Sequence, residues 1–316
     1  MMTRLATGAA NQTAPVSFTI ARSTLVWIAP SALSVATGAA LAGRVPETAF
    51  LALAVVVGLP HGAFDHKVAR RAFGQRYGAG WWQPFLVGYL ILASAMLLAW
   101  WAAPTFALSL FLFLSVLHFG DQDASSGAPY RLVRIAAHGG APIIVSAACH
   151  PDAVGQLFAT LTPAHADAVT IMLGGPLLTL WTATVAGTLA VHTARAQADN
   201  WTAAIDLILV SLLFVVAPPL IAFSLYFAAI HAPRAFAAAM PAGGVQRGEI
   251  ALPLVLTMLG LVLGGIIFAA GARTPAGDNV VRTAFLLLSA LTVPHMWLEW
   301  CARTALANAL AFRSKV

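Results

Sequence analysis

The feature that most constrains this chain is a series of long apolar stretches that carry almost no charge. Asp, Glu, Lys and Arg make up only 9% of the 316 residues, and 60% of the residues are hydrophobic. A soluble globular domain carries roughly 25% charged residues. This chain cannot present a soluble surface, so the sequence predicts an all-α, polytopic integral membrane protein built as a helical bundle.

Ten apolar segments account for most of the length, and a membrane span takes about 20 helical residues. Their approximate bounds are 18–41, 46–66, 84–102, 104–119, 131–149, 168–191, 203–217, 219–239, 250–270 and 280 to beyond 300. Two of the breaks, at Pro104 and Pro219, are very short. Proline is favoured in the first turn of a helix, so each is interpreted as a tight turn with a new helix after it. Merging both pairs leaves eight spans as the alternative.

The positions of the basic residues favour ten spans. If the N-terminus is inside and the segments alternate in direction, 14 of the 17 lysines and arginines lie on the inner side. This matches the positive-inside rule, and it explains the net charge of +6 without a nucleic-acid partner. We therefore expect a multi-pass protein of the inner (plasma) membrane with both termini cytoplasmic. A disordered or interfacial tail is expected at 1–17, and a single transmembrane domain at 18–312.

Four histidines are expected at one depth in the membrane. His61, His118, His231 and His295 lie about 12 to 15 residues into the second, fourth, eighth and tenth segments, which all run inward, so helix rise places them within about 5 Å in depth. Ionisable groups at this depth are costly and indicate function. Imidazole ligands suit iron, copper, zinc or nickel, and the first two would indicate oxygen chemistry. The alternative is that these histidines are hydrogen-bonded contacts between helices.

A carboxylate follows three of these histidines at a spacing of three or four residues, which places both side chains on one helix face. Such a carboxylate can accept the second ring N–H of a metal-bound imidazole and so fix its orientation. The three carboxylates are Asp65, Asp121 and Glu299.

Two more histidines and several aromatic residues are expected around this layer. His66 points about 140° away from His61 on an ideal helix, and His138 lies at a similar depth beside two glycines. Both are therefore interpreted as supporting groups rather than ligands. Aromatic side chains near the layer are candidates for the wall of an apolar tunnel, or for ordinary packing; they are Phe64, Phe119, Tyr226, Phe227 and Trp297.

Four motifs in these segments together resemble the Brp/Blh family of membrane-embedded β-carotene 15,15′-dioxygenases. The resemblance covers about residues 46–300. The four motifs are Pro60-His61-Gly62-Ala63-Phe64-Asp65-His66, His118-Phe119-Gly120-Asp121, Tyr226-Phe227 with His231-Ala232-Pro233-Arg234, and Thr292-Val293-Pro294-His295-Met296.

The resemblance implies a non-haem Fe(II) held by histidines, O₂ as co-substrate, and cleavage of β-carotene at its central double bond to two retinals. A retinal-binding rhodopsin is then an expected partner. The chain departs from the family pattern at Ala235, where the family has a second histidine four residues after the first. Either His295 completes a set of four histidines, or the centre has three, or the activity of this member is altered.

Three rival functions remain open on the sequence alone. A proton-coupled membrane transporter would use the three carboxylates as a relay, but no internal repeat is evident. A membrane desaturase or hydroxylase would need histidine boxes with adjacent pairs, and the chain has no His-His. A retinal- or carotenoid-binding factor that assists rhodopsin assembly would keep the family's binding site without its activity.

Overall fold

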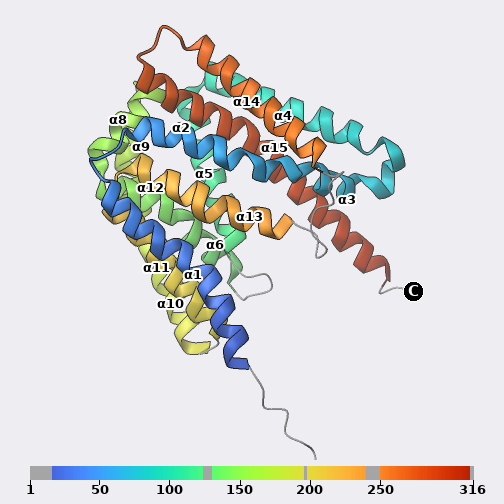
Figure 1. Ribbon diagram of the computed structural model, residues 1–316, viewed down its shortest axis with the longest axis horizontal. Helices are drawn as coiled ribbons and strands as arrows, with labels where there is room; N and C mark the ends of the chain where they lie inside the picture. Colours follow the sequence, from blue (N-terminus) through green and yellow to red (C-terminus); the bar gives the residue numbers. More distant parts are fainter. Residues whose placement is uncertain (1–15, 124–129, 196–197, 240–249, 314–316) are drawn as a thin grey trace, which may run out of the picture.

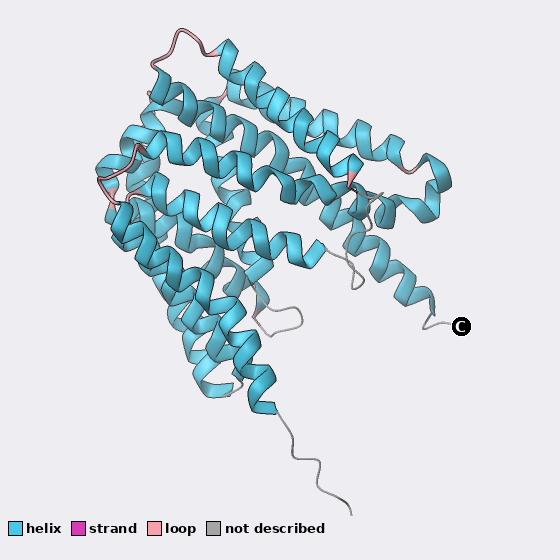
Figure 2. Cartoon of the chain, viewed as in Figure 1, coloured by secondary structure: helices cyan, strands magenta, loops and turns pink. Residues whose placement is uncertain are grey.

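A computed structural model describes residues 16–123, 130–195, 198–239 and 250–313 of the chain (Figure 1). All regular secondary structure within these ranges is helical (Figure 2), which confirms the predicted all-α class. The expected tail at 1–17 lies almost wholly outside the described residues.

The helices follow one another with short connections. In chain order they are α1 (Val16–Leu41), α2 (Glu47–Gly58), the 3₁₀ segment η1 (Leu59–Phe64), α3 (Asp65–Tyr77), the 3₁₀ segment η2 (Gly78–Gly80), α4 (Trp82–Ala102), α5 (Pro104–Asp123), α6 (Arg131–Gly140), the π segment η3 (Ala141–Val145), α7 (Ser146–Cys149), α8 (Pro151–Leu161), α9 (Ala166–Met172), the π segment η4 (Leu173–Leu177), α10 (Leu178–Arg195), α11 (Ala198–Val216), α12 (Pro219–Leu225), the π segment η5 (Tyr226–His231), α13 (Ala232–Ala239), α14 (Ala251–Ala270) and α15 (Ala276–Arg313).

Eight helical stretches among the described residues are long and apolar enough to cross a membrane, as expected for a multi-pass membrane protein. The predicted segments 18–41 and 203–217 are also helical. Their apolar helical stretches, Ile28–Leu41 and Trp201–Val216, are shorter than these eight. The eight-span alternative required two pairs of segments to form continuous helices, and neither pair does. A non-helical residue, Ala103, separates α4 from α5, and α12 begins a new helix at Pro219. The orientation of the termini stays a prediction.

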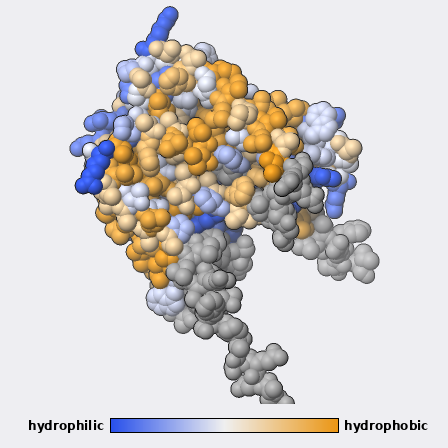
Figure 3. Space-filling model, viewed as in Figure 1, coloured by the Kyte–Doolittle hydropathy of each residue, from blue (hydrophilic) through white to orange (hydrophobic). Residues whose placement is uncertain are grey.

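Helix α15 organises the part of the bundle that matters for function, because α2, α3, α4 and α14 all pack against it (Figure 1). On the other side, α5 packs against α6, α6 against α10, and α1 against α11. Helix α12 joins the two groups through its contact with α2. The apolar face seen in Figure 3 is the surface that such a bundle would present to lipid.

The structure departs from the expected regular helices at four places, and a proline accounts for each. Pro60, Pro142 and Pro176 lie inside η1, η3 and η4, and Pro233 follows η5 by two residues. Proline lacks the N–H that the α-helical ladder needs, so the turn before it tightens or widens. The sequence analysis also missed α8, which it left in the connection between the segments 131–149 and 168–191.

Candidate metal centre and its cavity

Three of the four predicted histidines lie side by side, although each comes from a different helix. The ring centroids of His118 in α5 and His231 in η5 are 4.9 Å apart, and those of His118 and His295 in α15 are 5.1 Å apart. His118 and His231 are buried, and the side chain of His295 is only 12% exposed. Three imidazoles are thereby held together away from bulk water.

Close packing of α5 on α6 fixes the position of His118. A Cβ atom on Gly120 would overlap the carbonyl oxygen of Ile135, and one on Gly139 would overlap that of Val116. The two backbones therefore touch just beside His118, and only glycine allows this approach.

The π turn η5 fixes the position of His231. The turn ends at His231, whose ring stacks at 6.0 Å on Tyr226 and at 6.0 Å on Phe227. Phe119 meets the same ring edge-on at 4.8 Å. Single π turns recur at functional sites, because the wider turn redirects one side chain relative to a regular helix.

The two ring nitrogens of His295 face different carboxylates. Nδ1 donates a hydrogen bond of 2.6 Å to Oδ1 of Asp65, which places the proton of the neutral ring on Nδ1. Nε2 faces Oε1 of Glu299 at 3.6 Å, which is longer than a hydrogen bond. The sequence analysis expected Glu299 to orient this ring. In the structure Asp65 accepts the ring N–H instead, and Glu299 lies on the side where a metal would bind.

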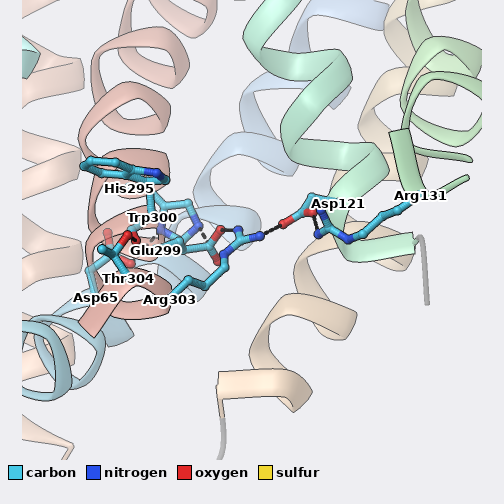
Figure 4. A network of polar contacts seen from close by, with 8 residues as sticks. All are labelled: Asp65, Asp121, Arg131, His295, Glu299, Trp300, Arg303 and Thr304. Carbon is cyan, nitrogen blue, oxygen red and sulfur yellow. Dashed lines mark hydrogen bonds and ion pairs between the residues drawn. The ribbon is translucent and has the colours of Figure 1, made fainter. Parts of the chain in front are cut away.

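Asp121 lies in a network of ion pairs. It pairs with Arg131 and with Arg303 (Figure 4). Arg303 also bonds Glu299 over 3.2 Å. A continuous polar chain thus runs from His295 through Glu299 and Arg303 to Asp121, and it joins α15 to α5 and α6.

The remaining predicted histidines lie in or near the same region. The backbone of His61 lies in η1, and its side chain is outside the described residues. A 3₁₀ segment has three residues per turn, so positions 61 and 65 are about 120° apart around the helix axis. In a regular α-helix the same two positions would be about 40° apart. The Nδ1 of His66 hydrogen-bonds the carbonyl of Ala63 over 2.9 Å. His138 is buried in α6.

A cavity of about 370 Å³ lies against the histidine cluster. Its walls come from η1, α4, α5, α12 with η5, α14 and α15, and most of the lining side chains are apolar. The polar lining residues are Asp65, Tyr89, Ser115, His118, Thr257, Thr292 and His295. A second cavity of about 80 Å³ shares five wall residues with the first.

Two of the five aromatic residues expected in a tunnel wall line the larger cavity, and they are Phe119 and Phe227. The other three lie in helix contacts. Phe64 and Tyr226 are buried among aromatic neighbours, and Trp297 fills the space beside a glycine of α4. Helical spacing placed these residues near the histidine layer, but it could not show which of them face empty space.

With this geometry in place, comparison with known proteins identifies the family. The sequence pattern described as beta-carotene 15,15′-dioxygenase matches residues 52–301. The chain belongs to this family. A beta-carotene 15,15′-dioxygenase of the uncultured marine bacterium 66A03 is 32% identical over 252 residues, covering 78% of this chain and 90% of the relative. A probable beta-carotene 15,15′-dioxygenase, Blh, of Halobacterium salinarum is 28% identical over 321 residues, covering 90% and 93%. No solved structure matches the chain.

Three side chains in this member of the dioxygenase family are placed so that they could bind one metal ion together. One ligand atom from each of His118, His295 and Glu299 lies within 4.8 Å of the others. Two ligands at about 2.1 Å from a shared ion span about 4 Å at most, so the side chains would draw in by less than about 1 Å. Nε2 of His295 and Oε1 of Glu299 face each other over 3.6 Å, which is a spacing that a shared cation would bridge.

Sequence reasoning missed four polar residues of the cavity wall, which are Tyr89, Ser115, Thr257 and Thr292. Tyr89 of α4 donates a hydrogen bond to the carbonyl of Leu291 over 3.4 Å and lines the cavity with Asp65. The signal was present, since Tyr89 and Ser94 are the only hydroxyl-bearing residues of the segment 84–102.

Proposed function

We propose that this protein is a non-haem iron dioxygenase that cleaves the central 15,15′ double bond of β-carotene with O₂ to give two retinals. The observation that carries the proposal is the cluster of three histidines with Glu299, two of whose histidines, His118 and His295, line a mostly apolar cavity. The named activity of two relatives that span most of the chain supports the substrate.

His118, His231 and His295 are the described residues that would hold the iron, with His61 as the predicted fourth histidine and Glu299 beside them. Bound Fe(II) would supply the binding and activation of O₂. One carbon–carbon double bond breaks and two aldehyde carbonyls form, so both oxygen atoms of O₂ enter the products and no external reductant is needed.

The protein's own residues supply orientation, a fixed proton and the exclusion of water. Asp65 holds a proton at Nδ1 of His295, which leaves the Nε2 lone pair directed at the metal position. Phe119 and Phe227 form apolar walls next to the histidines, and a polyene can lie against their rings. The apolar lining favours a hydrocarbon over water in the rest of the cavity.

The expected location of the protein and its expected partner follow from this chemistry. Substrate and product are both hydrophobic, so an intramembrane site avoids their transfer through water. The inner (plasma) membrane as location and a retinal-binding rhodopsin as recipient stay predictions.

The proposal is tested in carotene-producing cells by measuring retinal, followed by measurement of iron in the purified protein. We expect retinal formation and stoichiometric iron. His118→Ala, His231→Ala and His295→Ala should each lose iron and activity. His165→Ala is the matched control, because His165 is exposed and bonds Thr105 far from the cavity.

Two outcomes would contradict parts of the proposal. Active protein without bound metal would overturn the histidine centre. Bound iron with intact carotene and no retinal would favour the carotenoid-binding factor over the dioxygenase.

A further inference from the structure

Two helices on the outer side of the cavity contribute one face each to its wall. From α4 these wall residues are Phe85, Leu86, Tyr89, Leu90 and Ala93. From α14 they are Leu256, Thr257, Leu259, Gly260 and Leu263. Both sets recur every three or four residues, so each helix turns a single stripe toward the cavity. Both helices pack on α15, which lies at the back of the cavity.

Three of these wall residues are also exposed on the outside of the molecule. Leu86, Leu90 and Leu259 are 46%, 57% and 59% exposed, although each lines the cavity. These three leucines therefore lie where the edge of the cavity meets the molecular surface. The space between α4 and α14 that they border is called the mouth below.

The mouth lies near the middle of α4 and α14, which is the depth of the bilayer core when both helices span it. Leu90 is close to the middle of Trp82–Ala102, and Leu259 is close to the middle of Ala251–Ala270; both helices are long and apolar enough to span a membrane. The side chains around the mouth are apolar as well. Exposed residues there include Val87, Ile91, Val255, Met258 and Val262, and Figure 3 shows hydrophobic surface over this part of the molecule.

Polarity in the cavity is uneven. The titratable side chains of its wall other than Tyr89 are Asp65, His118 and His295, and none of them borders the mouth. A ligand that enters from the lipid would therefore meet apolar side chains and the two hydroxyls of Tyr89 and Thr257, but no group that titrates in the ordinary pH range, before it reached the histidines. Ions and polar metabolites have no favourable path through such an opening.

We infer that the mouth between α4 and α14 admits a long, uncharged polyene directly from the bilayer core. This inference rests on the proposed function and names the route by which its substrate arrives. The part of α5 that lines the cavity, Phe111 to Phe119, is about 12 Å long by helix rise. A 40-carbon polyene is longer than this, so we expect part of it to extend through the mouth while it is bound.

The test narrows the mouth with bulky apolar side chains and leaves the metal centre intact. The double variant Leu90→Trp with Leu259→Trp should lower the initial rate of retinal formation in carotene-loaded membranes by about tenfold or more, with unchanged iron content. The matched control is Leu98→Trp with Leu252→Trp. These leucines lie on the same two helices, are 62% and 43% exposed, and are not wall residues. The control should retain the rate of the unmodified protein.

A second measurement keeps this inference separate from the proposed function. β-Carotene retained per purified protein is measured by absorbance, without O₂, and the mouth variant should retain far less than the control. If the unmodified protein makes no retinal, the proposed function fails, and carotene retention alone decides the inference. Equal rates and equal retention in the mouth variant and the control would overturn it, and so would an equal loss in both.

Discussion

At the scale of single residues, Asp65 has the largest influence on the site. Its side chain is buried, and burial of an unpaired carboxylate costs several kcal/mol. The hydrogen bond to His295 offsets this cost and simultaneously fixes the imidazole tautomer. Because Asp65 is on α3 and His295 on α15, the orientation of one ligand depends on the packing of two helices.

Replacement of Asp65 by Asn should weaken metal binding while it preserves the shape of the side chain. A neutral amide accepts the ring N–H less strongly, so iron affinity should fall about 10- to 100-fold, as for other residues that orient metal-bound histidines. Iron retained against a competing chelator measures this. Asp278→Asn is the control, since Asp278 is exposed in the first turn of α15. Unchanged iron retention in Asp65→Asn would contradict the role given to Asp65.

The sequence indicated the residue types of the site better than their partners. Membrane depth alone placed His118, His231 and His295 in one layer, and the structure brings the three rings together. The spacing of Asp65 from His61 and of Glu299 from His295 suggested partners within one helix. Glu299 does face His295, but the acceptor of the ring N–H of His295 is Asp65, which belongs to another helix. A periodicity along one helix carries no information about such contacts between helices.

At the scale of helices, the contact between α5 and α6 depends on glycine. Gly120 and Gly139 lie where each backbone touches the other. Neither has a positive φ value, so the requirement is one of space and not of backbone conformation.

Replacement of Gly139 by Ala should separate α5 from α6 and displace His118. Overpacking of this kind typically costs about 1–3 kcal/mol, and a contact with backbone atoms leaves little room for relaxation. Thermal unfolding in detergent, followed by circular dichroism, should show a lower Tm together with loss of iron. Gly187→Ala is the control, because a Cβ atom there meets nothing within 4 Å; it should leave Tm unchanged or raise it. A Gly139→Ala protein with normal Tm and iron would show that the contact is not required.

The positions of the long helices could be read from hydrophobicity, but their irregular turns could not. The four prolines at these turns are Pro60, Pro142, Pro176 and Pro233. Whether a proline gives a 3₁₀ turn, as in η1, or a π turn, as in η3, depends on what the surrounding helices require. The mouth between α4 and α14 was not predictable, because it is a relation between two segments that are far apart in the chain.

At the scale of the whole molecule, one buried polar cluster ties distant helices to the site. Arg234 of α13 binds both carboxylate oxygens of Asp206 in α11, over 2.7 and 2.9 Å. Ser31 of α1 donates a hydrogen bond of 2.5 Å to the same carboxylate. Arg234 follows His231 by three residues, so this cluster connects α1 and α11 to the helix that presents a proposed ligand.

Replacement of Asp206 by Asn should destabilise the entire bundle. Removal of one partner from a buried ion pair leaves the other charge uncompensated and costs about 3–5 kcal/mol. A lower Tm is expected, with loss of iron as a consequence. In the control Asp152→Asn, an exposed carboxylate at the start of α8 is lost, which costs at most about 1 kcal/mol. If both variants unfold at the same temperature, the cluster does not stabilise the fold.

The π turn at Tyr226–His231 restricts how the length of the chain can vary. The turn holds one residue more than an α-helical turn. Deletion of one residue within it would restore a regular α-helix and leave Arg234 nearly in phase with Asp206, but it would change the direction of His231 relative to the helices on either side. Deletion of one residue from the regular helix before it, between Pro219 and Leu225, would instead change the phase of everything that follows by about 100°. Changes of chain length within this stretch should therefore be selected against as strongly as the loss of a site residue.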